Sequence, residues 1–378
     1  MKIVLISNAA SLEEFCLQAQ KESCIGVDTE FCRITTYWPQ IRLVQIATSD
    51  TIALIDPLSL ENLDPLKTLF YDEKILKIFH AARQDLEIFF YLWGQIPGPI
   101  ADTQLLACLC GYGESISYEK LVKSVLGKTI NKNVSYTEWD QRPLTEHQIS
   151  YAAADVRHLE TLYTQLSKRA GNKISWIQEE MDTLESPTTY KHLPENGWKR
   201  IKITFPNSNP QFWANLKGLA AWREELAQKT DTVRSRILKD DVLKDLARKD
   251  PLSVQDLERA LPHDKKNMAT SILEQIAQCG AITPPFSSKD LKNPCKIDLL
   301  KILLKQVADD HNIPSRLIAS QQELENFVHN PKKHLVTTGW RGEIFGQEAL
   351  AILHGKKAIG LKKDKIHMFN VLELEEVE

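Results

Sequence analysis

Hydrophobic and polar positions in the first 170 or so residues follow two alternating patterns, which predict strands and helices in turn. Apolar runs predict strands over residues 3–6, 25–31, 41–47 and 51–55. Ser11 with Glu14, and Thr145 with Gln148, have the spacing of the capping boxes that begin helices. Basic residues before Gly171 predict the end of the helix that Thr145 begins. We therefore expect an α/β domain around a central sheet over residues 1–171.

The remainder of the chain is predicted to be helical. Residues 172–206 combine one amphipathic segment with several prolines, which predicts a linker that contains one helix. Two helical blocks follow at 207–285 and 291–370, separated by the segment Thr283-Pro-Pro-Phe-Ser-Ser288, and neither shows the alternation typical of strands. An acidic tail is expected over 371–378. A length of 378 residues agrees with two or three domains.

Composition and charge narrow the class of protein. Hydrophobic residues make up 43% of the chain and charged residues 26%, which excludes global disorder. The net charge of -3 gives no whole-chain signature of a nucleic-acid partner, although residues 291–370 carry a basic surplus. The 7 cysteines lack the paired spacing of a zinc site and are expected to be reduced, buried thiols. No signal peptide or membrane-length apolar run is recognised, so we expect a cytoplasmic protein with no membrane association.

Four carboxylates in three separate segments are candidate metal ligands. Asp28 and Glu30 lie two apart in a predicted strand, so both side chains leave the same face, where they would need a cation. Asp85 follows a strand at the start of a predicted helix, which can direct it toward the sheet. Asp155 lies one helical turn after Tyr151, on the same helix face. Each residue alone could have an ordinary structural role, but their occurrence together and in this order favours a metal site.

These segments resemble the motifs of a known superfamily. Asp-Thr-Glu-Phe at 28–31, His-Ala-x-x-x-Asp at 80–85, Ala-Asp-Thr-Gln at 101–104 and Tyr-x-x-x-Asp at 151–155 resemble the three exonuclease motifs of the DEDD superfamily, in its tyrosine-bearing branch. Ser150 stands where the other branch has histidine. The segment from Trp139 to Thr145 and the two helical blocks narrow the resemblance to ribonuclease D. Asp102, within the third of these segments, is expected to cap a helix near the site.

The resemblance implies a fold and an activity. The fold is an α/β ribonuclease H-like exonuclease domain, with a mixed sheet flanked by helices, followed by two small all-α HRDC-like domains at 207–285 and, more diverged, at 291–370. The activity is 3′-to-5′ exoribonucleolytic trimming of RNA with a free 3′ end, transfer-RNA precursors and other stable RNAs among them, with release of nucleoside 5′-monophosphates. No obligate protein partner is evident.

The resemblance also implies the cofactors and the catalytic residues. Two divalent metal ions, Mg²⁺ or Mn²⁺, would be held by Asp28, Glu30, Asp85 and Asp155, whose hard oxygen ligands suit these ions. Tyr151 would orient the attacking water. The catalytic residues are thus the four acids and this tyrosine.

Candidate RNA contacts lie in two regions. Trp38, Trp139 and Arg142 flank the motifs, where they could stack on bases or contact phosphate, but packing of the two tryptophans against the domain is about equally favoured. Arg234, Arg236 and Lys239 lie in the first helical block and could contact phosphate. In this block Val233 stands where members of the HRDC family commonly have proline.

Two other functions remain open. A DNA exonuclease of the repair type would use the same acids, because two-metal hydrolysis accepts either sugar unless the site contacts the 2′-hydroxyl. An inactive RNA-binding scaffold would retain the fold, but such proteins generally lose acids from the site, and this chain keeps all four.

Overall fold

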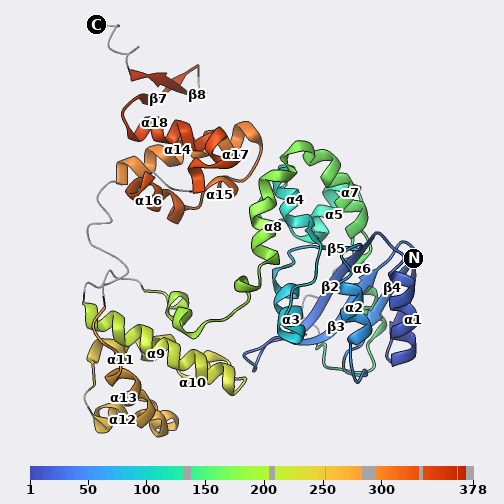
Figure 1. The fold of residues 1–378 in the computed structure, drawn as a ribbon, viewed down its shortest axis with the longest axis horizontal. Coiled ribbons are helices and arrows are strands. Elements are labelled where there is room, and N and C mark those ends of the chain that lie inside the picture. Colours follow the sequence, from blue (N-terminus) through green and yellow to red (C-terminus); the bar gives the residue numbers. More distant parts are fainter. Residues whose placement is uncertain are drawn as a thin grey trace.

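The computed structural model describes residues 1–130, 138–203, 209–251, 253–282, 294–331, 335–363 and 365–371. Figure 1 shows an α/β domain, a first helical domain at 209–282 and a second helical domain at 294–371. The segment Thr283–Ser288, expected to separate the helical domains, and residues 372–378 of the expected acidic tail lie outside the described residues. Within the described part, no helix has the length and apolar character needed to cross a membrane.

The α/β domain is built on a six-stranded mixed sheet. Its strands are β1 (Lys2–Ile6), β2 (Cys24–Cys32), β3 (Gln40–Ala47), β4 (Thr51–Ile55), β5 (Leu76–Phe79) and β6 (Ile100–Asp102), in the order β1-β4-β3-β2-β5-β6. Strand β3 runs antiparallel to β2 and β4, whereas the pairs β1–β4, β2–β5 and β5–β6 are parallel. The four strands expected from the apolar runs are confirmed, and so is the mixed sheet flanked by helices.

Helices cover both faces of this sheet (Figure 1). Helices α1 (Ala9–Ala19), α2 (Asp64–Phe70) and α3 (Arg83–Trp93) bury one set of apolar side chains, which includes Phe15, Phe70 and Phe89. Helices α4 (Thr103–Leu109), α5 (Tyr118–Leu126), α6 (Glu146–Val156) and α7 (Leu159–Ala170) bury a second set, which includes Leu121 and Leu162. The two cores lie on opposite faces, as the alternation of side chains along the strands requires.

The ends of two helices differ from the sequence-based expectation. Thr145 and Gln148 form the expected capping box at the start of α6. The predicted capping box at Ser11 is wrong, because Asn8 caps α1 and its side chain accepts the backbone N–H of Ser11. The single helix expected up to Gly171 is two helices, α6 and α7. The helix is interrupted near His158, whose backbone N–H donates to the hydroxyl of Tyr118 at 3.0 Å.

The expected linker is packed against the rest of the protein. It contains one α-helix, α8 (Gln178–Glu185), as predicted, together with the 3₁₀ helices η1 (Gly171–Ile177), η2 (Pro187–Thr189) and η3 (Pro194–Arg200). Ile177 and Tyr190 are buried in the two cores of the α/β domain, and Ile201 is buried in the first helical domain. The segment is therefore a structural bridge between the two domains.

The first helical domain consists of α9 (Pro210–Lys229), α10 (Arg234–Ile237), α11 (Asp240–Lys249), α12 (Val254–Ala260), η4 (His263–Met268) and α13 (Ala269–Ala277). Its core surrounds the fully buried Trp213 of α9, with Leu219, Leu243 and Ile272 against it. Tyr37 from the α/β domain belongs to the same core and is 1% exposed. The two domains therefore share apolar packing.

The second helical domain is helical except at its end. It contains α14 (Pro294–His311), α15 (Ser315–Ile318), α16 (Gln321–His329), η6 (Leu335–Thr337), α17 (Gly339–Arg341), the π-helical turn η7 (Gly342–Gly346) and α18 (Gln347–Leu353). The expectation that block 291–370 is wholly helical is wrong at a hairpin of β7 (Lys357–Lys362) and β8 (Lys365–Asn370). Ile359 pairs with Met368 across the hairpin, and both pack against the helical core, so an apolar face stabilises it.

The two helical domains repeat one backbone motif. Asp231 and Asn312 each follow the long first helix with a positive φ, of 45° and 53°. A four-residue helix begins three residues later in both cases, as α10 and as α15. Leu238 and Ala319 end these short helices with nearly equal angles, φ -156° and ψ 130° against φ -157° and ψ 134°. This repetition supports the interpretation of the second domain as a diverged copy of the first.

Candidate active site

Strand β2 presents two acids on the sheet face that α6 and α7 cover. Side chains alternate along a strand, so Gly26, Asp28 and Glu30 share that face. A Cβ atom at Gly26 would lie 3.1 Å from both the Cβ of Leu159 and the carbonyl oxygen of Val156. The glycine thus allows the junction between α6 and α7 to approach β2 closely. That approach brings the end of α6 to the acids of the strand.

Two further acids reach the same place from α3 and α6. Asp85 lies in the first turn of α3, directly after β5, the neighbour of β2 in the sheet. Its Oδ1 accepts a hydrogen bond from the hydroxyl of Thr29 on β2. Asp155 lies in the last turn of α6, and both Asp85 and Asp155 are buried. Three segments that are distant in sequence therefore place carboxylates beside the middle of β2.

The four acids interact electrostatically at Asp28. Burial raises the pKa of Asp28 well above its ordinary value, and the charges of Asp85, Asp155 and Glu30 raise it further, in that order. Burial also raises the pKa of Asp85 to about 7, although the hydrogen bond from Thr29 opposes that rise. Like charges held together in a poorly hydrated site destabilise one another. The cluster is therefore a site that a cation would stabilise.

The donor set fits a hard divalent cation. Among the residues that the structure describes, no group of three or more His, Cys, Asp or Glu side chains is arranged to hold a metal ion as it stands. Mg²⁺ does not require such a cage, because it keeps several waters and is bound by one or two carboxylates together with substrate phosphate. A site made of buried carboxylates, whose pKa values are raised by burial and, at Asp28, by the charges of the other acids, matches this mode of binding.

Two tyrosines adjoin the acids. Tyr151 lies one turn before Asp155 on α6, and its ring centroid is 6.1 Å from that of Trp139, at an angle of 49°. Tyr118, which the sequence analysis did not single out, lies behind the site. Its pKa is raised by burial and by the charges of Asp155 and Asp28, while the N–H of His158 opposes the rise. No local pattern around Tyr118 indicates this position.

Asp102 supports the turn that carries Asp85. Its side chain accepts the backbone N–H groups of Gln104 and Leu105, so the predicted role as a helix cap is confirmed. The same carboxylate also accepts the N–H groups of Ala81 and Ala82, at 3.1 and 2.9 Å. Ala81 has a φ of 63°, which is uncommon for a residue with a side chain, and these hydrogen bonds hold it there.

Arg142 is held by the protein itself. Its guanidinium donates to both oxygens of Asp56, each at 2.7 Å, and to the carbonyl oxygens of Trp139 at 2.7 Å and Arg42 at 2.8 Å. Burial would raise the pKa of Asp56, but the hydrogen bonds from Arg142 and Ser59 hold it below its ordinary value. These contacts favour a structural role for Arg142, which anchors the loop before α6, over the phosphate contact that the sequence suggested.

Arg234 and Trp38 lie in the contact between the α/β domain and the first helical domain. The guanidinium of Arg234 pairs with the buried Glu224 and donates to the hydroxyl of Tyr37 at 2.9 Å. Trp38 stacks on Tyr91 with ring centroids 4.7 Å apart. Its backbone N–H donates to the carboxylate of Asp231 in the first helical domain. A structural role is thus favoured for both. Arg236 and Lys239, the other predicted contacts, are exposed on the first helical domain.

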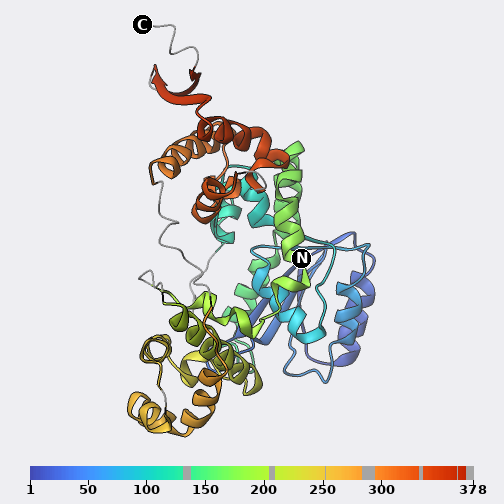
Figure 2. The same ribbon diagram turned by 60° about the vertical axis from the view of Figure 1, so that its left-hand side comes forward.

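The second helical domain contacts the bridge segment through a different set of side chains. Arg341 is 4% exposed, pairs with Glu179 and Glu180 of α8, and donates to a carbonyl oxygen of its own domain. Trp176 and Trp340 stack with centroids 4.7 Å apart and planes 4° apart. Figures 1 and 2 both show this domain beside α8. Buried charges and aromatic rings therefore anchor the first helical domain to the α/β domain and the second helical domain to the bridge segment.

Comparison with known proteins adds the family context. The 3′-5′ exonuclease family matches residues 3–170, and the HRDC domain family matches residues 214–277. Ribonuclease D of Gluconacetobacter diazotrophicus is 35% identical, with 96% of each chain covered, and that of Zymomonas mobilis is 38% identical, with 96% of this chain and 97% of that one covered. The crystal structure of Escherichia coli RNase D, described as an exoribonuclease involved in structured RNA processing, superimposes with a TM-score of 0.83 at 28% identity, over 94% of this chain and 99% of that one.

Proposed function

Because the chain belongs to the ribonuclease D family and is a 3′-to-5′ exoribonuclease, we propose that it trims RNA 3′ ends by two-metal-ion hydrolysis. Its substrate class is RNA. The proposed substrates are transfer-RNA precursors and other stable RNAs, and the proposed products are nucleoside 5′-monophosphates. The observation that carries the proposal is that three segments distant in sequence bring Asp28, Glu30, Asp85 and Asp155 to the middle of β2.

The exonuclease family implies dependence on divalent metal ions. We propose that the ions are Mg²⁺ or Mn²⁺ and that Asp28, Glu30, Asp85 and Asp155 hold them. When bound, such ions lower the pKa of an attacking water and stabilise the charge on the departing 3′ oxygen. Asp28 and Glu30 are fixed by the strand and Asp85 by the turn that Asp102 caps, so the donors are held by rigid elements.

Tyr151 and Trp139 are proposed to position the reacting groups. Tyrosine hydroxyls ordinarily keep their proton at neutral pH, so the proposed role of Tyr151 is to orient water through a hydrogen bond. It lies on the same face of α6 as Asp155, which favours this role. Trp139 lies beside Tyr151 and is half-buried, which leaves part of its ring available to stack on a terminal base.

The helical domains are proposed to bind the body of the RNA. Their contacts with the catalytic half fix them in place, so an RNA held by them would have its 3′ end at a constant distance from the acids. Arg236 and Lys239 are exposed on the first domain and suit contact with phosphate. In the second domain, the basic surplus over residues 291–370 is the corresponding feature.

The test uses the purified full-length protein with a 3′-extended transfer RNA and a 3′-extended single strand, each as RNA and as DNA of matched sequence. We expect stepwise shortening of RNA from the 3′ end, release of mononucleotides, and no reaction in EDTA. Asp155→Asn is expected to abolish hydrolysis while RNA affinity in Ca²⁺ and the melting temperature stay close to wild type. Asp309→Asn, which changes an exposed acid of the second helical domain, serves as the control. Near wild-type turnover by Asp155→Asn would remove Asp155 from the metal site.

A further inference from the structure

Two neighbouring pockets lie along helix α3, where the α/β domain meets η2, η3 and the first helical domain. The arginine pocket, about 290 Å³, is lined by Arg33, Arg83, Arg200 and Arg234. The aromatic pocket, about 420 Å³, is lined by Trp38, Phe90 and Tyr91. The two pockets are adjacent, because both are lined by Glu87, Tyr190 and His192.

The arginine pocket has an excess of positive charge. Glu87 pairs with Arg33 at 3.0 Å, and the buried Glu224 pairs with Arg234 and, at 3.3 Å, with Arg200. Two carboxylates therefore offset two of the four guanidinium groups that line the pocket. The remaining charge matches that of a phosphate group, and the planar forks of arginine match its oxygens.

Arg83 is the guanidinium that is available to a ligand. It is exposed in the first turn of α3, and within the described residues no ion pair or hydrogen bond engages its side chain. Burial raises the pKa of Tyr190, and the positive charge of Arg83 opposes that rise, which places this charge at the pocket wall. The charges of Asp102 and Asp85 act on the hydroxyl of Tyr190 as well, so the pocket that Tyr190 lines adjoins the catalytic acids.

His192 makes the wall of the pocket rigid. Its Nδ1 accepts a hydrogen bond from Nη2 of Arg200 at 2.6 Å, so its Nε2 carries the proton that is donated to Glu87 at 2.8 Å. These bonds join the bridge segment to α3 and hold Arg200 at the pocket. A ligand would find Arg200 already in place, which reduces the ordering cost of binding.

The aromatic pocket offers a surface for a base. Tyr91 is 48% exposed, and its ring stacks on Trp38 at 14° with centroids 4.7 Å apart, which fixes its orientation. Phe90 lies next to it on α3. Aromatic surfaces beside a basic groove are the features by which proteins bind single-stranded nucleic acids, because bases stack on the rings while phosphates contact the cations.

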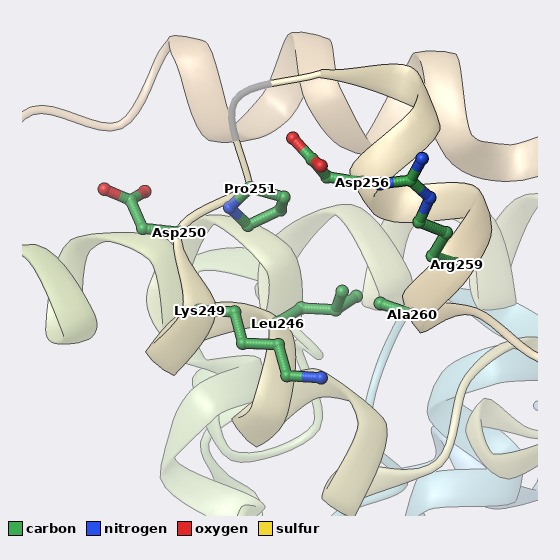
Figure 3. Close-up of a pocket in the computed structure, with 7 residues that line it drawn as sticks. All are labelled: Leu246, Lys249, Asp250, Pro251, Asp256, Arg259 and Ala260. Atoms are coloured by element: carbon green, nitrogen blue, oxygen red, sulfur yellow. The ribbon is translucent and has the colours of Figure 1, made fainter.

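A third pocket shows the contrast. It lies in the first helical domain between α11 and α12, with a volume of about 400 Å³ (Figure 3). Lys249 and Arg259 line it, but so do Asp250 and Asp256. The charges balance, so this pocket has no preference for an anion.

We propose that the arginine and aromatic pockets together bind one nucleotide, with its phosphate at Arg83 and its base against Tyr91. The nucleotide belongs either to the RNA chain near the catalytic acids or to a free mononucleotide, since the recognised groups are the same. Binding at this site needs no metal ion, so the proposal stands apart from the proposed hydrolysis. In EDTA no metal ion can join phosphate to the catalytic acids, so the change in affinity that a pocket substitution causes there reports on the pockets.

The test is calorimetric titration of the full-length protein in EDTA with AMP and, separately, with a single-stranded oligoribonucleotide. Arg83→Ala is expected to weaken binding by roughly tenfold to hundredfold, as loss of a charge-assisted hydrogen bond does. Lys21→Ala removes an exposed cation of the α/β domain that lies outside both pockets and both helical domains, and is expected to leave affinity unchanged. Melting temperatures of all variants show whether the fold is retained.

Each outcome distinguishes a source of the nucleotide or rejects the site. If Arg83→Ala binds AMP more weakly than the wild type does, the pockets are a mononucleotide site. If Arg83→Ala binds only the oligoribonucleotide more weakly, the pockets are a site for the RNA chain. Unchanged affinity of Arg83→Ala for both probes would overturn the proposal. Tyr91→Ala is expected to weaken binding by about tenfold, because a base can no longer stack on the ring. The effect should appear with the same probe whose binding Arg83→Ala weakens. Unchanged affinity of Tyr91→Ala would overturn the placement of the base.

Discussion

Asp85 should destabilise the metal-free protein at neutral pH, and replacing it should make that protein more stable. Burial raises the pKa of Asp85 from 3.8 to about 7. At about 1.4 kcal/mol for each pH unit, that rise corresponds to roughly 4 kcal/mol between the charged and the neutral carboxyl group. Because the folded protein holds this proton more tightly than the unfolded chain, the free energy of unfolding falls as pH rises from about 4 to about 7. Above that window the whole penalty is present.

Asp85→Asn mimics the neutral carboxyl group at every pH. Its amide oxygen can still accept the hydrogen bond that the hydroxyl of Thr29 donates to Asp85. In EDTA we expect the variant to match the wild type near pH 4 and to exceed its free energy of unfolding by up to about 4 kcal/mol at pH 8. At pH 8, added Mn²⁺ should stabilise the wild type more than the variant, while the variant loses hydrolysis.

The assay is urea unfolding followed by circular dichroism, in EDTA, at pH values from 4.5 to 8. Asp309→Asn is the control, because it makes the same chemical change at an exposed acid outside the catalytic cluster. An Asp85→Asn protein that is no more stable than wild type at pH 8, or a difference that does not grow with pH, would refute the reasoning from burial and mutual repulsion.

Three further changes test the contacts around the catalytic centre. Glu224→Ala leaves Arg234 without its buried partner and should lower stability by about 3–5 kcal/mol; an unchanged urea midpoint would contradict this role. Burial would raise the pKa of Glu224, but the hydrogen bond from Arg234 holds that pKa below its ordinary value. The charged form of Glu224 therefore stabilises the fold at neutral pH, and this stabilisation is lost on acidification. Arg341→Ala should release the second helical domain from α8, seen as faster proteolysis after α8, and wild-type resistance would argue against that anchor. Trp139→Ala should weaken binding of a single-stranded RNA in Ca²⁺ by about tenfold, whereas unchanged affinity would favour a packing role.

Residues with local signals could be predicted from the sequence. Asp28 and Glu30 interrupt an apolar strand, and Asp155 follows Tyr151 by one helical turn, so their placement on common faces follows from strand and helix geometry. The capping role of Asp102 follows from the residues after it. These features depend on neighbours a few positions away, which is the range over which sequence patterns are informative.

The contacts between domains could not be predicted in this way. Tyr37 donates to Glu224 across 187 positions of the chain, and no periodicity relates the two residues. For the same reason Arg142 and Arg234 were expected to be free for phosphate, although Asp56 and Glu224 engage them. The hairpin at the end of the second helical domain was missed because its six-residue strands are only half-buried and rich in lysine.

The burial of Tyr37 inside the first helical domain makes this domain a poor unit for transplantation. If residues 209–282 alone were moved to another protein, their apolar core would lack Tyr37, which the loop between β2 and β3 supplies. The protein from which they were removed would expose the ring of Tyr37, which is buried in the intact chain. Any graft should therefore carry that loop along with the helices. Evolutionary replacement of either half faces the same constraint, because substitutions at the seam must be accepted by both partners at once.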